Sequence, residues 1–334
     1  MVFPVLELPA VALGQVLRGF TSSDLFEMHQ CSLKTGHALK QFQSQIKTIK
    51  TNVDFQRKWV DVKGVHRYQV CTAEENQGVV PETTRFFDGE EVPFEMVGGK
   101  AFNTFWPADK KDEGLMHITT DLIRSLGLTQ LESILIDKSS SAQEVLQWID
   151  RCQVKMENFN LVNTVRGNED ALADIIYTDE FFRKVSMNFV SLLEVSPEYT
   201  AKNWKISNTC INLFQLHLQD SHWLTLEHLL AFNTGSIVLY RSKLSNADLK
   251  KYLKLWKEQN YTRLQYMSIN LTEGQKFDIR EIIGELVEPN TIRVEEDQQE
   301  FVTLNRPDKV GELSLNADKT VLTYFVDDVP KPNA

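Results

Sequence analysis

Cysteine is scarce in this sequence of 334 residues, which contains four. Cys31, Cys71, Cys152 and Cys210 lie far apart, and none stands at metal-ligand spacing from a second cysteine or a histidine. The pattern predicts neither disulfides nor a metal site. It favours buried free thiols in a protein of the cytoplasm or the nucleus, where thiols stay reduced.

Motifs of catalysis are also missing. The sequence contains no G-x-G-x-x-G, no G-x-x-x-x-G-K-[ST] and no G-x-S-x-G. His217, Asp220 and His222 come nearest to a metal cluster or a catalytic triad, and the alternative is that these histidines lie on the surface or cap a helix. We therefore expect a protein that is not an enzyme and that holds no cofactor or metal.

Long apolar runs and an excess of basic charge are missing as well. No run reaches the roughly 18 apolar residues that a membrane-spanning helix needs, and no charged region followed by an apolar block marks a signal peptide. The 36 basic and 46 acidic side chains give a formal net charge of −10, which argues against nucleic-acid binding through bulk charge. We expect a globular protein that binds neither membranes nor nucleic acid.

Residues 1–45 contain short apolar helices that are too small to enclose a core of their own. Pro9 suits the first turn of a helix, because its missing N–H costs nothing there. An apolar stripe at helical spacing follows, made of Leu13, Val16, Leu17 and Phe20. Residues 21–24 offer N-cap side chains for a second helix, and Leu39 and Phe42 suggest a third. The apolar stripe needs cover, either from a partner or from the rest of the chain.

This segment resembles an F-box, the motif that docks on the Skp adaptor of SCF-type ubiquitin ligases. The matching positions are Leu8-Pro9, Leu13, Val16-Leu17, Phe20, Asp24-Leu25 and Cys31-Ser32. The sequence departs from the motif at Val11, where Glu is common, and at Thr35, where many F-boxes have Trp. The resemblance implies that the adaptor is bound by Leu8, Pro9, Leu13, Val16, Leu17, Phe20 and Leu25. Leu17 is the residue that we most expect to hold the F-box helices together, and a helix that packs only on its own domain is the alternative.

Residues 46–112 predict a small antiparallel sheet. Short strand-like runs surround Trp59, Tyr68, Phe86 and Phe94, and Asp88-Gly89 lies between the last two as a hairpin turn. Near the other end of the chain, residues 301–329 predict a second hairpin with a turn at 316–319. This hairpin would cap an edge of the sheet.

From about residue 113 an apolar pattern recurs, with helical stretches between several of its copies. The copies are Leu131/Ile134/Ile136, Met156/Phe159/Leu161, Met187/Val190/Leu192, Ile211/Phe214/Leu216 and Leu264/Met267/Ile269. Helical periodicity is found at 142–149, 172–176, 226–230 and 249–256. The fold class predicted is mixed α/β: a small helical F-box, then an irregular leucine-rich-repeat-like α/β solenoid with antiparallel β elements at its ends. An ordinary α/β sheet is the alternative.

Residues 205–285 resemble the type 2 F-box-associated domain of the F-box proteins that are greatly expanded in nematodes. The match runs in order through Trp223–Asn233, Ile237–Leu239, Ser242–Leu249, Tyr252–Trp256 and Leu264–Met267. The two resemblances imply an F-box at 1–45, the β region at 46–112 and the F-box-associated domain at 113–330. They imply the substrate-recognition subunit of an SCF-type ubiquitin ligase, which a Skp-type adaptor links to a cullin and which holds an unknown protein target. A non-ligase binding scaffold with a degenerate F-box is the alternative.

Side chains between the apolar positions of the strands are the predicted target-binding residues. In a solenoid these positions face away from the helices, on the side that repeat proteins use for binding. The residues are Asn158, Asn160, Asn188, Asn212, Gln215, Tyr240, Gln265 and Tyr266. A face rich in amides and tyrosines suits protein recognition, and an ordinary hydrated sheet surface is the alternative.

Overall fold

The computed structural model describes residues 8–20, 24–25, 28, 50–62, 66–98, 101–137, 141–162, 169–202, 204, 210–258, 263–287, 291–295 and 297–328. The chain divides into two compact units, Met1–Glu157 and Asn158–Ala334. Cys31, Thr35 and the third helix predicted around Leu39 and Phe42 lie outside the described residues.

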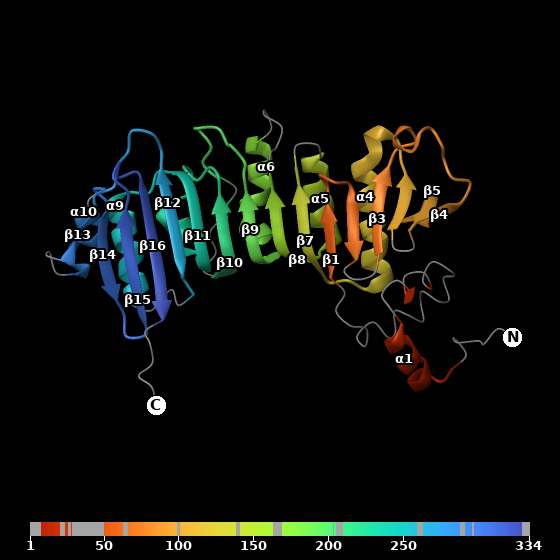
Figure 1. The fold of residues 1–334 in the computed structure, drawn as a ribbon, viewed down its shortest axis with the longest axis horizontal. Coiled ribbons are helices and arrows are strands. Elements are labelled where there is room, and N and C mark those ends of the chain that lie inside the picture. Colours follow the sequence, from red (N-terminus) through yellow and green to blue (C-terminus); the bar gives the residue numbers. More distant parts are fainter. Residues whose placement is uncertain are drawn as a thin grey trace. The chain divides into compact units, whose positions relative to one another are not determined.

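The first unit contains helix α1 (Ala10–Gly19) and a sheet with two longer helices (Figure 1). Its strands are β1 (Thr51–Asp54), β2 (Trp59–Val62), β3 (His66–Cys71), β4 (Thr84–Phe87), β5 (Glu90–Val97), β6 (Ala101–Phe105) and β7 (Gln130–Ile136), in the spatial order β7-β1-β2-β3-β6-β5-β4. The helices are α4 (Lys111–Leu126) and α5 (Ala142–Cys152). Short 3₁₀ turns cover Glu74–Asn76 and Ala108–Lys110.

The predicted antiparallel sheet of the first unit is confirmed for most strand pairs and is wrong for one. Strand pairs β1–β2, β2–β3, β4–β5 and β5–β6 are antiparallel, and Asp88-Gly89 forms the hairpin turn with positive φ at both residues. Strands β3 and β6 run parallel. The reason is the connection over residues 72–83, which is long enough to cross over and start β4 in the direction of β3. Strand β5 then reverses this direction and β6 reverses it again, so β6 also runs in the direction of β3.

The second unit is a sheet of parallel strands that continues into antiparallel ones. Strand β8 (Lys155–Leu161) lies at the boundary, and the other strands are β9 (Val185–Ser191), β10 (Ile211–Leu218), β11 (Phe232–Ser242), β12 (Tyr266–Leu271), β13 (Arg293–Val294), β14 (Glu300–Asn305), β15 (Lys309–Leu315) and β16 (Val321–Asp328). Their order is β9-β10-β11-β12-β16-β15-β14-β13. The helices are α6 (Glu169–Ile176), α7 (Asp179–Phe182), α8 (Leu226–Leu230), α9 (Asn246–Lys257) and α10 (Ile279–Ile283), with a 3₁₀ turn at Gly284–Leu286.

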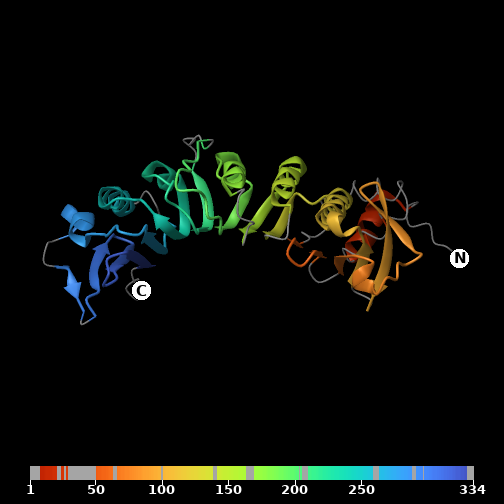
Figure 2. The same cartoon turned by 90° about the horizontal axis from the view of Figure 1, so that it is seen from above.

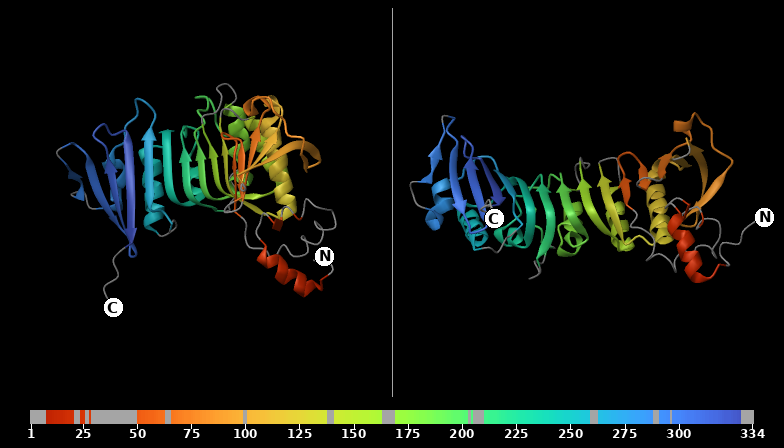
Figure 3. Two further views of the ribbon diagram at one scale, coloured as in Figure 1. Left: turned by 45° about the vertical axis from the view of Figure 1, so that its right-hand side comes forward. Right: turned by 60° about the horizontal axis from the view of Figure 1, so that its bottom comes forward.

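Strands β9 to β12 are parallel, and helices that lie on one side of the sheet precede β9, β11 and β12 (Figure 2). The helical stretches expected at 172–176, 226–230 and 249–256 correspond to α6, α8 and α9, and Ser245 caps α9 through a capping box with Asp248. The predicted C-terminal hairpin is confirmed as β15 and β16 with a turn at 316–319, and β16 pairs antiparallel with β12 (Figure 3). The described residues therefore form a mixed α/β fold, as predicted.

The buried face of the second unit is lined by a cross-strand row of apolar residues. The row consists of Phe189, Leu216, Ile237, Met267 and Tyr324, each directly opposite the next. Tyr177, Phe182 and Phe159 surround Phe189 with ring centroids 6.4, 4.5 and 5.4 Å away. This aromatic packing between the helices and the strands forms the core of the second unit.

One predicted apolar copy is wrong in register at Met187, and a second is wrong only at Phe214, because its Ile211 and Leu216 are buried as predicted. Met187 and Phe214 are 42% and 45% exposed, whereas Phe189 and Leu213 are buried. In both strands apolar residues occur at adjacent positions, so the pattern alone allows either face. A shift by one residue turns every side chain of a strand to the other face, and the aromatic contacts of Phe189 decide the register.

Three cysteines can be placed, and they differ from the expected buried thiols. Cys71 and Cys152 are half-buried and Cys210 is exposed. Burial raises the pKa of the Cys71 and Cys152 thiols, which keeps both protonated at neutral pH. Within the described ranges no helix is long and apolar enough to cross a membrane.

Candidate functional site

The predicted adaptor-binding residues in and around helix α1 fall into buried and accessible ones. Leu13, Leu17 and Leu25 are buried, with 5%, 2% and 2% exposure. Pro9 and Val16 are exposed, while Leu8 and Phe20 are half-buried. The buried leucines pack inside the protein, so only part of the predicted set is available to a partner; the departure from the motif, Val11, is 80% exposed.

The side of the second unit's sheet that faces away from the helices carries a second cross-strand row. Asn188, Gln215, Ser236, Tyr266 and Phe325 stand directly opposite one another along β9, β10, β11, β12 and β16. We call this side the open face. Each member of the row is adjacent in sequence to a member of the buried row, because successive side chains of a strand point to opposite faces.

Three of the predicted target-binding residues, Asn188, Gln215 and Tyr266, therefore come together in one row. A fourth, Asn158, joins them, since its Oδ1 accepts a hydrogen bond of 2.6 Å from the Asn188 side-chain amide. The ring centroids of Tyr266 and Phe325 are 5.0 Å apart, and Phe325 is 53% exposed. The row thus changes from amides to aromatic rings along its length.

The other predicted residues lie on the same sheet but not in this row. Asn160 is half-buried on β8, and Asn212 is exposed on β10, where its Oδ1 accepts a hydrogen bond of 3.2 Å from Asn233. Tyr240 is 37% exposed on β11. Gln265 is exposed just before β12, and its backbone N–H donates to the Gly235 carbonyl.

His217 belongs to a neighbouring row of the open face, between Val190 and Val238. Its ring lies 5.6 Å from that of Tyr240, and its buried Nε2 atom has no hydrogen-bond partner among the described residues. Burial lowers the pKa of His217, so its imidazole is neutral at pH 7. A neutral imidazole beside a tyrosine can both donate and accept hydrogen bonds.

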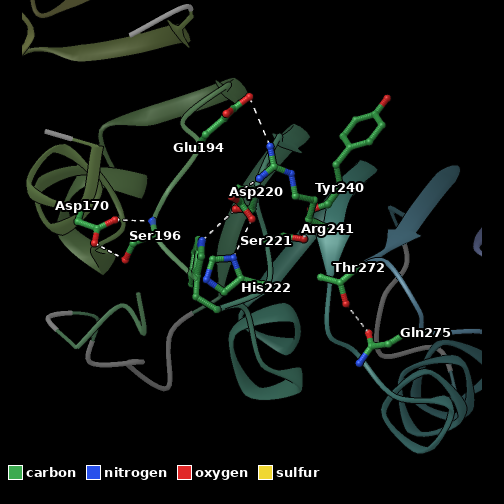
Figure 4. Close-up of polar contacts among 11 residues, drawn as sticks. Asp170, Glu194, Ser196, Asp220, Ser221, His222, Tyr240, Arg241, Thr272 and Gln275 are labelled. Atoms are coloured by element: carbon green, nitrogen blue, oxygen red, sulfur yellow. Dashed lines mark hydrogen bonds and ion pairs between the residues drawn. The ribbon is translucent and has the colours of Figure 1, made fainter. Parts of the chain in front are cut away.

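A β-bulge in β11 shapes the edge of the open face. The pairing of β11 with β12 shifts between Leu239 and Ser242, and Arg241 adopts a left-handed φ of 51°. Its guanidinium lies 3.4 Å from a carboxylate oxygen of Glu194 and 3.4 Å from one of Asp220 (Figure 4). The bulge therefore holds a half-exposed arginine between two carboxylates, next to Tyr240.

The histidine and aspartate cluster noted in the sequence is divided by the fold. His222 Nδ1 lies 2.7 Å from Asp220 Oδ1, and both side chains are buried, with 7% and 1% exposure. His217 belongs to the open face and does not contact this pair. The expectation of surface or capping histidines is wrong for His222, because the turn after β10 buries its side chain beside that of Asp220.

Further polar contacts fix the loops that follow the parallel strands (Figure 4). Asp170 accepts hydrogen bonds of 2.7 and 2.5 Å from the backbone N–H and the hydroxyl of Ser196, and Thr272 Oγ1 donates to Gln275 at 2.8 Å. These loops are thus ordered by side chains. In the part of the chain that the structure describes, no group of three His, Cys, Asp or Glu residues is arranged to hold a metal ion.

Sequence reasoning missed three features of the open face. Phe214 belongs to a predicted apolar copy and Phe325 to the predicted hairpin, yet both are exposed; the alternation of Phe325 with buried Tyr324 and Val326 is a signal that could have placed it outward. The position of Arg241 could not be predicted, because the β-bulge that holds it has no reliable sequence pattern. The proximity of His217 to Asp220 and His222 in the sequence suggested one cluster, whereas its position in a strand places it on the open face.

Comparison with known proteins identifies a family match over the middle part of this face. Residues 205–269 match the model of the F-box associated family, a stretch that includes β10, α8, β11 and α9. The chain therefore carries an F-box-associated domain, as the second resemblance predicted. The F-box at residues 1–45 stays a prediction.

A relative matches a longer stretch of the chain. The Skn-1 dependent zygotic transcript 15 protein of Caenorhabditis elegans is 25% identical over 223 residues, which are 65% of this chain and 62% of that protein. The match thus covers less than two thirds of the relative's length. No solved structure matches the chain.

Proposed function

We propose that this protein is the substrate-recognition subunit of an SCF-type ubiquitin ligase. The observation that carries the proposal is the F-box-associated domain at residues 205–269, preceded by an N-terminal helix with the spacing of an F-box. In this role the protein is not an enzyme. It binds a Skp-type adaptor, and through it a cullin, and holds a protein target in the cytoplasm or the nucleus, so that a reaction catalysed by another subunit becomes effectively intramolecular.

Helix α1 is the proposed adaptor-binding element. Val16 and Pro9 are exposed and can enter a partner's apolar pocket, whereas Leu13 and Leu17 hold the helix in place. An interface of this kind depends on a few apolar anchors in a desolvated centre. Val11 lies on the exposed part of the helix, where it adds apolar area in place of a charge.

The open face of the second unit is the proposed target-binding element. Parallel strands with helices on one side support the leucine-rich-repeat-like arrangement predicted for this region, in which the side without helices binds the partner. Amides, tyrosines and a neutral imidazole provide adaptable hydrogen bonds there, and Phe214 and Phe325 provide apolar contact area.

Co-purification of the full chain with a recombinant Skp-type adaptor tests the proposal. Wild type should retain the adaptor at micromolar concentration, and Val16→Asp should weaken retention by about tenfold or more, because a carboxylate would be buried in an apolar contact. Val294→Asp is the matched control, since Val294 is an exposed valine of the second unit.

Two outcomes would count against the proposal. If wild type does not retain the adaptor, the ligase assignment is lost and a binding scaffold with a degenerate F-box replaces it. If Val16→Asp and Val294→Asp bind the adaptor equally well, α1 is not the docking element.

A further inference from the structure

The open face ends in a cavity of about 660 Å³ at the antiparallel part of the second unit's sheet. Phe325, Glu312 and Thr303 stand opposite one another on β16, β15 and β14 and form part of its lining. Gln265 and Asp327 line it as well. The cavity therefore continues the row that begins with Asn188 and Gln215, so a segment lying along the row reaches it.

The cavity is acidic. Its lining includes the carboxylates of Glu312, Asp327 and Asp328 and the ammonium group of Lys309, so three negative charges and one positive charge leave a net charge of −2. Lys309 Nζ lies 3.8 Å from Asp328, and the exposed Arg293 lies 2.8 Å from Glu312. Asp327 has no ion pair among the described residues. A cation entering the cavity would therefore meet at least one carboxylate whose charge is not already compensated.

The cavity also has an aromatic wall. Phe325 is 53% exposed, and its ring is held by contact with Tyr266, whose centroid is 5.0 Å away. An exposed aromatic face beside carboxylates suits a side chain that has an apolar stem and a cationic end, because the stem packs on the ring and the cation is attracted to both the ring and the carboxylates. Among protein side chains, arginine and lysine combine these properties.

We propose that this cavity binds an arginine or lysine side chain of the target protein. The inference rests on the proposed function, in which the open face binds the target. It specifies the chemistry of one residue of that target. The target segment lies across the strands, with its backbone along Asn188 and Gln215 and its basic side chain over Phe325. The cation pairs with Asp327, and the negative net charge of the protein draws a basic segment toward the face.

Peptide binding tests the inference with the full chain. The probes are two fluorescein-labelled nonapeptide pools of random sequence, identical except that the central residue is arginine in one and glutamate in the other. Fluorescence anisotropy should give about tenfold tighter binding of the arginine pool to wild type. Asp327→Asn and Phe325→Ala should each reduce this preference several-fold, while Glu258→Gln, which neutralises an exposed carboxylate beyond α9, should leave it unchanged.

The result that overturns the inference is equal binding of the two pools by wild type, or no binding of either up to about 1 mM. A preference that Asp327→Asn and Phe325→Ala leave intact also overturns it, because the basic residue then binds elsewhere. Circular dichroism of each variant shows that it is folded. Adaptor co-purification reports separately on the ligase assignment: a chain that retains the adaptor but lacks the arginine preference refutes only the cavity, and the reverse result refutes only the ligase.

Discussion

The two faces of the sheet in the second unit are built from neighbouring residues of the same strands, yet they have different chemistry. Phe189, Leu216 and Ile237 are fully buried in one row, and Asn188, Gln215 and Ser236, each one position earlier, form the corresponding row on the open face. The buried row removes apolar area from water and stabilises the fold. The open row contributes little to stability and is free to take part in binding. The comparison predicts that substitutions on the two faces have separable effects.

The largest effect is expected for removal of a core ring. Phe189→Ala should lower the free energy of unfolding by about 3–5 kcal/mol, because it deletes a fully buried side chain within an aromatic cluster and leaves a cavity. Phe325→Ala, on the open face, should cost less than about 1 kcal/mol. Urea unfolding of the full chain followed by circular dichroism measures both. Similar losses for the two variants would show that Phe325 is not on a free surface.

An intermediate effect on stability is expected for Arg306, whose charge is buried between the antiparallel strands and helix α9. The Arg306 side chain has no exposed area; its Nη1 donates to the Trp256 carbonyl at 3.2 Å, and its guanidinium lies over the Trp256 ring at 5.0 Å. Arg306→Met should destabilise the protein by about 2 kcal/mol, because it leaves that carbonyl without its charged donor. Arg293→Met removes a surface pair with Glu312 and should change stability by less than about 0.5 kcal/mol.

Thermal unfolding of these two arginine variants at neutral pH provides the measurement. An equal decrease in Tm would contradict the distinction between a buried anchor and a surface ion pair. It would also mean that the β14–β15 hairpin is not held against α9 by Arg306.

The smallest expected effect is on the pH dependence of stability and comes from His217 on the open face. Burial lowers the folded-state pKa of His217 below the usual value of 6.5. The unfolded chain therefore binds a proton more readily, so the stabilising contribution of the neutral imidazole is fully present above about pH 6.5 and is lost as the pH falls toward the folded-state pKa. His217→Gln should make the Tm fall less steeply than wild type between pH 7.5 and 5.5.

His228 adds the same pH dependence to both proteins. Burial lowers its pKa too, so wild type and His217→Gln should both lose stability in this window, to different extents. Identical slopes for the two proteins would show that His217 is hydrated like an ordinary surface histidine.

Local structure was predictable where one signal dominated. The periodicity of Leu249, Tyr252, Leu253 and Trp256 predicted α9, and Asp88-Gly89 predicted the hairpin turn. The strands containing Met187 and Phe214 were not predictable to the residue, because apolar side chains stand at adjacent positions and either could face the core. The predicted target-binding residues were located on the sheet, but nothing in the sequence showed that Asn188, Gln215 and Tyr266 share one row.

The sequence by itself determined the mixed α/β class, the helices α6, α8 and α9 of the second unit and the F-box-associated domain, since each of these depends on local periodicity or on a specific order of residues. Only the tertiary structure decided which residues of each strand reach the surface, how His217 separates from the Asp220–His222 pair, and that Phe325 meets Asp327 and Glu312 in one cavity. Such arrangements depend on register between strands far apart in the sequence, and register is set by packing of the whole core. The open face and its acidic cavity are therefore properties of the fold.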